Sequence, residues 1–234
     1  MAFNFYFTIL LLSVSIAQAF GNDYTSINAE EARHRAKRAP GDLLETVVLT
    51  EAEKIEIVRL HNQYRSRANA SDMLAMSWDN TIAQFASNYI SNCDFAHSTN
   101  AQRSSISGFS IIGENLGTQI TSSNIRSRDY ILSVTQAWHN EINDYFYDTF
   151  SCIANKACGH YTQVVWAKTY KIGCGAAFCR RATSTVGYRL LVSCNYGPAG
   201  NFLNNTAQPS RVGRPFERKG APCSQCAQQD TCVD

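Results

Sequence analysis

The chain has 234 residues, of which 44% are hydrophobic and 17% are charged, and its formal net charge is +2. This composition is that of a folded domain with a hydrophobic core, and the near-neutral charge excludes the basic surface that nucleic-acid binding requires. Residues 1–38 hold four basic and three acidic residues, so the remainder is equally close to neutral. The length fits one main domain, and we expect no nucleic-acid partner.

The N-terminus has the pattern of a secretory leader. Residues 5–17 form an apolar run that is too short to span a bilayer, and a small-residue Ala-Gln-Ala cleavage pattern follows it. We therefore predict a signal peptide at residues 1–19 and a secreted, extracellular product without a transmembrane segment. Residues 20–38 are polar and end in a multibasic stretch, which is typical either of a propeptide cleaved after Arg38 or of a solvated linker.

The cysteines and sequons agree with an extracellular location. Nine cysteines in a secreted chain favour disulfides over a redox site. Two Asn-x-Ser/Thr sequons predict N-glycosylation at Asn69 and Asn204. Because the cysteine count is odd, one thiol is left over after pairing within the chain.

The first predicted helix covers residues 50–67. Thr50 and Glu53 form a capping box, and apolar or aromatic positions recur behind it at helical spacing. His61 and Arg65 lie on this helix, one turn apart. Such a pair can fasten a helix to its neighbours, and we favour this structural role for His61 over a role as a ligand.

A second helix is predicted to begin at Asp79 and Asn80. Its buried stripe follows the i, i+3, i+4, i+7 pattern and consists of Ile82, Phe85, Ala86, Tyr89, Ile90 and Cys93. His97 follows four residues later. Residues 99–127 are rich in Ser, Thr, Asn and Gly and predict a loop, inside which Glu114 has apolar neighbours. A carboxylate there is costly to bury unless a cation or a metal ion meets it.

A third helix is predicted from about residue 127. Its apolar face includes Trp138 and, one turn later, Glu141, at a position where solvent exposure would be usual for a carboxylate. The segment after it is rich in aromatic residues, namely Tyr145, Phe146, Tyr147 and Phe150. These rings either fill the edge of the domain or receive an apolar ligand or a protein partner.

The remaining core has the composition of β-strands. Residues 161–166, 172–179 and 188–196 are rich in β-branched and aromatic residues and predict three strands. His160 opens the first of these runs, as either a packed polar residue or a ligand. Helices followed by strands predict an α+β layered domain, which we place at residues 39–205.

Two groups of cysteines flank or follow this core. Only five residues separate Cys152 from Cys158, a spacing that suits a local disulfide loop. Residues 206–234 predict an extended tail that carries Cys223, Cys226 and Cys232. In a secreted chain without a matching second pair, this cluster favours a disulfide over zinc.

Four segments together resemble the signature motifs of the CAP superfamily, which comprises cysteine-rich secretory, antigen-five and pathogenesis-related-one proteins. They are HNQYR at 61–65, GENL at 113–116, GHYTQVVWAKT at 159–169 and LVSCNYGPAGNF at 191–202. The resemblance covers roughly residues 50–205 and is closest to the peptidase-inhibitor-like branch. It implies a three-layer α-β-α sandwich of the CAP (SCP) type, held by disulfides.

The resemblance also implies a cleft tetrad of His97, Glu114, Glu141 and His160. In the family the two histidines can bind zinc or a similar divalent ion, and the glutamates hydrogen-bond around the site. Neutral imidazoles are good zinc ligands, but two of them make only a weak, exchangeable site. We therefore expect zinc not to be obligatory, and the alternative is a tetrad whose members satisfy one another without an ion.

The disulfides that the resemblance implies are Cys93–Cys179 and Cys174–Cys194, with Cys152–Cys158 completing the core. A further pair that is usual in cysteine-rich secretory proteins is missing, because its positions are Ile112 and Gly197. The tail resembles the family hinge but has three cysteines where the hinge normally has four. Cys223–Cys232 is the pairing we expect there; either the tail is truncated, or Cys226 or a neighbour pairs with another chain.

Two classes of function follow from the resemblance. The first is a secreted, non-catalytic binding protein for a sterol, a fatty acid or an extracellular protein, with the aromatic segment or the cleft as the site. The second is a metal-dependent endopeptidase or other hydrolase in which a metal at the histidines activates water and a glutamate acts as base. No Gly-x-Ser-x-Gly or His-Glu-x-x-His motif is present, so we favour the binding protein.

Overall fold

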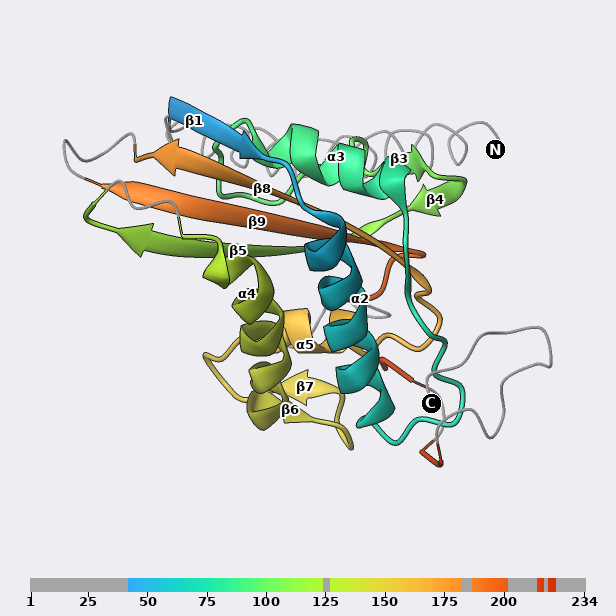
Figure 1. The fold of residues 1–234 in the computed structure, drawn as a ribbon. Coiled ribbons are helices and arrows are strands. Elements are labelled where there is room, and N and C mark those ends of the chain that lie inside the picture. The colour runs from blue at the N-terminus through green and yellow to red at the C-terminus, as the bar shows by residue number, and fades with distance from the viewer. Residues whose placement is uncertain (1–41, 124–126, 182–186, 202–213, 217–218, 222–234) are drawn as a thin grey trace, which may run out of the picture. The chain divides into compact units, whose positions relative to one another are not determined.

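A five-stranded sheet forms the centre of the fold (Figure 1). The computed structural model describes residues 42–123, 127–181, 187–201, 214–216 and 219–221. The strand order is β1-β8-β9-β5, with β2 beside β8. The bounds of these strands are β1 Asp42–Val47, β2 Ser77–Trp78, β5 Gly113–Thr121, β8 Lys171–Arg180 and β9 Tyr188–Gly197. All pairs are antiparallel except β2 with β8.

Helices cover both faces of this sheet. Helix α3 (Asn80–Ile90) packs on β8 and β9, and α4 (Asp129–Asn140) and α5 (Gly159–Val164) lie on the opposite side (Figure 1). Helix α2 (Glu51–Ser66) packs against α4 and α5. The described chain is therefore the predicted α+β fold, a three-layer α-β-α sandwich. None of its described helices combines the length and apolar character needed to cross a bilayer.

The smaller elements lie in the connections between the main helices and strands. Two short hairpins pair β3 with β4 and β6 with β7, and a 3-10 helix, η1, follows α4 directly. Their bounds are β3 Ser104–Ile106, β4 Phe109–Ile111, η1 Glu141–Asp144, β6 Tyr145–Phe146 and β7 Ser151–Cys152.

The first two helices begin where the sequence predicts. The Thr50 hydroxyl accepts from the Glu53 amide at 3.2 Å, and the Glu53 carboxylate accepts from the Thr50 amide at 2.7 Å, which is the expected capping box. In α3, the Asp79 carboxylate caps the amide of Ile82 at 2.9 Å. The predicted stripe of α3 is buried at Ile82, Ala86, Ile90 and Cys93.

The prediction of a loop at 99–127 is wrong. The structure places β3, β4 and the nine-residue strand β5 there, and β5 pairs with β9 along its whole length. The glycines that made this stretch look like a loop allow helices to approach the strand. A Cβ at Gly113 would collide with the side chain of Gln163, and one at Gly117 with that of Val134.

The prediction of a strand at 161–166 is also wrong, because the structure forms helix α5 there. Tyr161, Val164 and Val165 are all buried, and their i, i+3, i+4 spacing is helical. The Thr162 hydroxyl, which β-propensity counts in favour of a strand, lies 3.1 Å from the carbonyl of Gly159 in the same helical turn. Burial has overridden local propensity in this six-residue helix.

Arg65 is the centre of a buried hydrogen-bond cluster beneath α2. Its side chain is 0% exposed, and its guanidinium donates to five backbone carbonyls at 2.5–3.2 Å, those of Leu74, Val164, Trp166, Ala167 and Thr169. Burial lowers the pKa of Arg65 to about 9. One side chain thus fastens α2 to the end of α5 and to the segment that leads into β8.

Part of the predicted tail belongs to the core. Phe216 is only 4% exposed and stacks on Tyr147 with ring centroids 4.8 Å apart. Just beyond it, Lys219 forms a bridge with Ala70, and the Gly220 amide donates to the carbonyl of Asn69 at 2.8 Å. Residue 205 is therefore not the last residue that packs with the sandwich.

Candidate functional site

The first histidine–carboxylate pair joins the loop after α3 to strand β5. His97 lies in that loop, and Glu114 is the second residue of β5. The His97 Nδ1 contacts the Glu114 Oε1 at 2.8 Å. The Glu114 carboxylate also accepts from the Ser98 amide at 2.9 Å and from the Ser98 hydroxyl at 2.7 Å. The imidazole side chain is 57% exposed, whereas the carboxylate is fully buried.

These contacts keep Glu114 ionised. Burial alone raises the pKa of a carboxyl group, but the hydrogen bonds from His97 and Ser98 outweigh burial, so the pKa of Glu114 lies below its usual value. The buried negative charge is thus compensated by directed donors. This explains how a carboxylate can lie among the apolar residues that made Glu114 conspicuous in the sequence.

The second pair joins η1 to α5. The His160 Nδ1 contacts the Glu141 Oε1 at 2.6 Å, and the Glu141 Oε2 accepts from the backbone amides of His160 at 3.0 Å and Tyr161 at 3.3 Å. Glu141 therefore supplies acceptors to amides in the first turn of α5, which have no partner within the helix. Trp138 stacks on the imidazole of His160 at 6.0 Å, with only 16° between the ring planes.

The position of His160 is fixed from several directions. A disulfide to Cys152 holds Cys158, two residues before the histidine. On the other side, the Asn201 side chain donates to the carbonyl of Gly159 at 2.8 Å and accepts from the Thr162 hydroxyl at 2.7 Å. The ring of His160 is consequently held at its Nδ1, at its face and through its backbone, while its side chain stays 30% exposed.

A hydrogen bond links strand β5, which carries Glu114, to the helix that carries His160. Side chains alternate along a strand, so Glu114 and its neighbour Asn115 point to opposite faces. Asn115 donates to the backbone carbonyl of His160 at 3.1 Å, which connects the strand that carries one pair to the helix that carries the other. No group of three or more His, Cys, Asp or Glu residues in the described ranges is arranged to hold a metal ion.

The hydrogen bonds of the two histidines determine which atoms could ligate a metal ion. In both pairs the Nδ1 atom is engaged by a carboxylate, which leaves Nε2 as the ligand atom of each imidazole. A carboxylate behind the ligating histidine is the usual support of zinc-binding imidazoles. The donor set fits a divalent ion in kind but supplies only two nitrogen ligands, which corresponds to a weak site.

A buried relay behind His160 was not predicted as part of the site. The Asn115 side chain donates to the Tyr196 hydroxyl at 3.2 Å, and the Tyr196 hydroxyl lies 3.0 Å from the Nε2 of His61. The carbonyl of Ile57 accepts from the His61 Nδ1 at 2.8 Å, so Nε2 is the acceptor for Tyr196. His61 is fully buried and structural, as predicted. Asn115 and Tyr196 lie inside two of the four motifs, which was the available clue.

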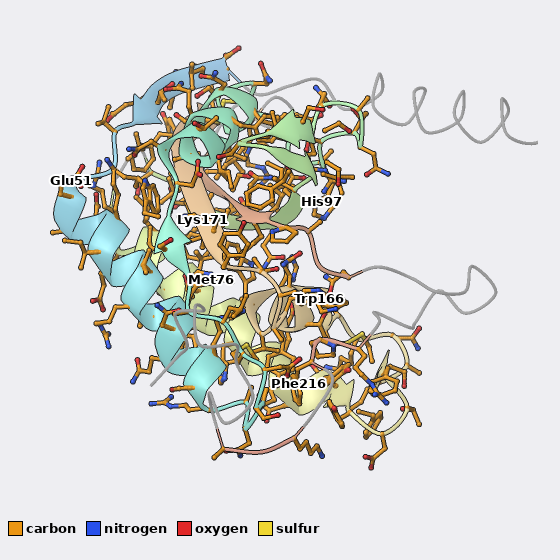
Figure 2. The ribbon with its side chains drawn as sticks, turned by 90° about the vertical axis from the view of Figure 1, so that its right-hand side faces the viewer. Glu51, Met76, His97, Trp166, Lys171 and Phe216 are labelled. Atoms are coloured by element: carbon orange, nitrogen blue, oxygen red, sulfur yellow. A yellow bond between two sulfur atoms is a disulfide. The ribbon has the colours of Figure 1, made fainter. Side chains whose placement is uncertain are left out.

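The aromatic segment after η1 is largely covered by the chain itself. Tyr145 packs against Tyr161 with ring centroids 5.7 Å apart, and Tyr147 packs between Phe150 and Phe216. The cations of Arg214 and Lys219 lie over the rings of Phe150 and Tyr147 at 4.5 and 4.4 Å. Phe146 differs from the other three, since it is 54% exposed. In Figure 2, Phe216 lies well below His97, so the aromatic segment and the first pair are distinct places.

The sequence as a whole matches a described family. A profile for "CAP: Cysteine-rich secretory protein family" matches residues 58–196, a range that contains both histidine–carboxylate pairs. The chain belongs to the CAP family. This confirms the resemblance found in the four motifs.

Relatives and solved structures agree with the family. The CAP chain is 39% identical over 191 residues to Peptidase inhibitor 16 of Mus musculus, which covers 80% of this chain but only 34% of that protein. It is 36% identical over 182 residues to GLIPR1-like protein 1 of Homo sapiens, covering 75% of this chain and 67% of that one. The structure titled "Crystal structure of NaASP2 with Zn2+" is 25% identical, with a TM-score of 0.56, and covers 75% of this chain and 90% of its own.

Three disulfides join the described cysteines of this CAP domain. They are Cys93–Cys179, Cys152–Cys158 and Cys174–Cys194, the pairs that the resemblance implies. Disulfides of this kind persist in oxidising, extracellular compartments. The predicted leader at 1–19, the processing site at Arg38, the sequon at Asn204 and the Cys223–Cys232 pair lie outside the described residues. Asn69 lies within them and is exposed.

Proposed function

We propose that the chain is an extracellular, non-catalytic CAP-domain protein that binds a divalent metal ion, such as zinc, reversibly at His97 and His160. The observation that carries this proposal is that each imidazole is held by a carboxylate at Nδ1, at 2.8 Å in one pair and 2.6 Å in the other. Such a contact fixes the ring and raises the basicity of its other nitrogen. With two protein ligands, water would complete the coordination and the ion would exchange readily.

The metal proposal is tested by zinc competition. The purified, metal-stripped chain is titrated against a chromogenic zinc indicator, beside His160→Ala and Glu141→Gln. We expect the loss of one of two ligands in His160→Ala to reduce zinc affinity at least about 10-fold, and the loss of the supporting carboxylate in Glu141→Gln to reduce it about 10-fold. His139→Ala is the matched control, since His139 stacks on Tyr64 instead. Equal zinc affinity in His160→Ala and the wild type would disprove the site.

For the aromatic segment we propose an apolar ligand, a sterol or a fatty acid, or the apolar surface of an extracellular protein. The support is Phe146, whose ring is 54% exposed at the β6–β7 hairpin. The other three aromatic residues are packed against the chain, so the ligand would contact Phe146 first. We expect Phe146→Ala to weaken binding of a fluorescent sterol or fatty acid at least about 5-fold. Ile120→Ala, on a 56% exposed residue of β5, should change nothing.

A hydrolase is the alternative from a different class. The contact of each histidine with a carboxylate is also found in catalytic triads, where the carboxylate orients the base. All six described cysteines are in disulfides, however, so none of them can serve as a thiolate nucleophile. Peptide hydrolysis that requires zinc and is lost in His160→Ala would replace the non-catalytic proposal with this one.

A further inference from the structure

A groove of about 820 Å³ lies between α3 and the connection from β1 to α2, with β8 as its floor. It shares no lining residue with either histidine–carboxylate pair or with the aromatic segment. Its floor lies so close to α3 that a Cβ at Gly175 would collide with the backbone of Ser87. The volume is within the range of small-molecule sites in proteins, about 300 to 1,000 Å³.

The groove has fixed ends and a fixed rim. At one end the hydroxyls of Thr46 and Ser91 are 2.8 Å apart and join the two walls. At the other end the ammonium group of Lys54 lies 6.0 Å from the centre of the Trp78 ring. The rim at Val48 is held from outside, since its carbonyl accepts from Arg128 at 2.9 Å. A cleft held at these points is preorganised and loses little entropy when a ligand binds.

The lining carries little charge. No aspartate or glutamate is among the described residues that line the groove, and Lys54 is its one cationic side chain. The Lys54 ammonium is already paired with the Glu51 carboxylate at 2.6 Å. A strongly charged ligand would therefore leave water without gaining a counter-charge, which disfavours it. A neutral ligand has no such cost.

The polar lining along α3 is a row of amide side chains one turn apart, at Asn80, Gln84 and Asn88. Two hydrogen bonds orient this row: the indole of Trp78 donates to the Asn80 Oδ1 at 3.1 Å, and the Gln84 Nε2 donates to the Asn88 Oδ1 at 2.8 Å. Neither bond uses the NH₂ groups of Asn80 and Asn88 or the Oε1 of Gln84. A ligand would thus meet donors and an acceptor in alternation.

We propose that this groove binds a short neutral oligosaccharide. Sugar hydroxyls both donate and accept, so they match a row of amides and the hydroxyl of Ser87 better than an apolar ligand does. The half-buried ring of Trp78 offers a flat apolar surface for the C–H face of one sugar ring. This site is separate from the metal and lipid sites proposed above and does not depend on them.

The test is an NMR titration of the ¹⁵N-labelled full chain with maltotriose and with triacetylchitotriose. The chain has three tryptophans, and the indole N–H resonance of Trp78 is identified by its absence in Trp78→Phe. We expect that resonance to move in a saturable way with at least one of the two sugars, with a Kd of about 1 mM or lower. The other two indole resonances should not move.

The paired substitution Gln84→Ala with Asn88→Ala removes part of the amide row from the exposed side of a helix, where alanine is well tolerated. We expect it to weaken sugar binding at least about 10-fold, while zinc affinity stays unchanged. Gln136→Ala, an exposed glutamine on α4, is the matched control and should bind as the wild type does. No movement with either sugar, equal affinity in the double variant, or preference for a sulfated heparin oligosaccharide would each overturn the proposal.

Discussion

Replacing Arg65 by methionine should destabilise the domain more than any change on the exposed face of the same helix. The substitution keeps an unbranched apolar stem but removes a guanidinium that donates to five carbonyls. Two of these carbonyls, of Trp166 and Ala167, also accept from backbone amides. The loss therefore falls mainly on the carbonyls of Leu74, Val164 and Thr169.

The magnitude follows from this count. A buried polar group left without its partner costs about 1–3 kcal/mol. Three such carbonyls give roughly 3–9 kcal/mol. The desolvation cost of the buried guanidinium, which the methionine variant avoids, is subtracted from this sum. We expect a net loss of about 4 kcal/mol in the free energy of unfolding, a large part of the 5–15 kcal/mol of a typical domain. Arg65→Lys keeps a charge but only three donors, so it should lose about half as much.

The assay is urea unfolding at pH 7 with the disulfides intact, followed by far-UV circular dichroism. The matched control is Arg59→Met on the same helix, because Arg59 is 54% exposed and pairs with Glu56 at the surface. That change should cost less than about 0.5 kcal/mol. A loss below about 1.5 kcal/mol in Arg65→Met, with Arg59→Met unchanged, would refute the reasoning that the carbonyls depend on this guanidinium.

Three further changes test other parts of the structure. Burial lowers the pKa of His61 from 6.5 to about 4, so between these pH values the unfolded chain is protonated at His61 and the folded chain is not. The free energy of unfolding, measured as a function of pH, should therefore fall by roughly 3 kcal/mol from pH 7 to pH 4, and by less in His61→Gln. Phe216→Ala removes a ring that stacks on Tyr147 and should lower stability by about 3 kcal/mol in urea unfolding; a change under 1 kcal/mol would contradict its place in the core. Gly117→Ala forces a methyl group against Val134 and should lower the melting temperature by several degrees, whereas an unchanged melting temperature would mean that α4 can retreat from β5 at little cost.

The parts of the fold that the sequence predicts well are those with local physical causes. The start of α2 rests on the Thr50–Glu53 capping box, and α3 rests on the Asp79 cap and a complete helical stripe. The long strands β8 and β9 rest on segments that are apolar at most positions. Each of these determinants lies within one element, so a single sequence contains it.

The parts that were missed depend on contacts between elements. The glycines of strand β5 leave room for the side chains of Gln163 and Val134, which pack against the strand. This packing is visible only in three dimensions. Helix α5 is too short to show a clear helical period, so its β-branched residues led to the prediction of a strand. The tetrad came from the family resemblance, whereas its arrangement as two histidine–carboxylate pairs is visible only in the structure.

The burial of Phe216 has a consequence for the order in which the protein is made. Synthesis runs from the N-terminus, so strands β1 to β9 are all translated before this ring exists. Until then Tyr147 has no stacking partner from the C-terminal segment, and the bridge from Lys219 to Ala70 cannot form. Ser71, which completes the Asn69 sequon, is 1% exposed in the finished fold. The nascent domain therefore passes through a state with an open edge, in which this sequon is accessible and the ring of Phe216 has yet to arrive.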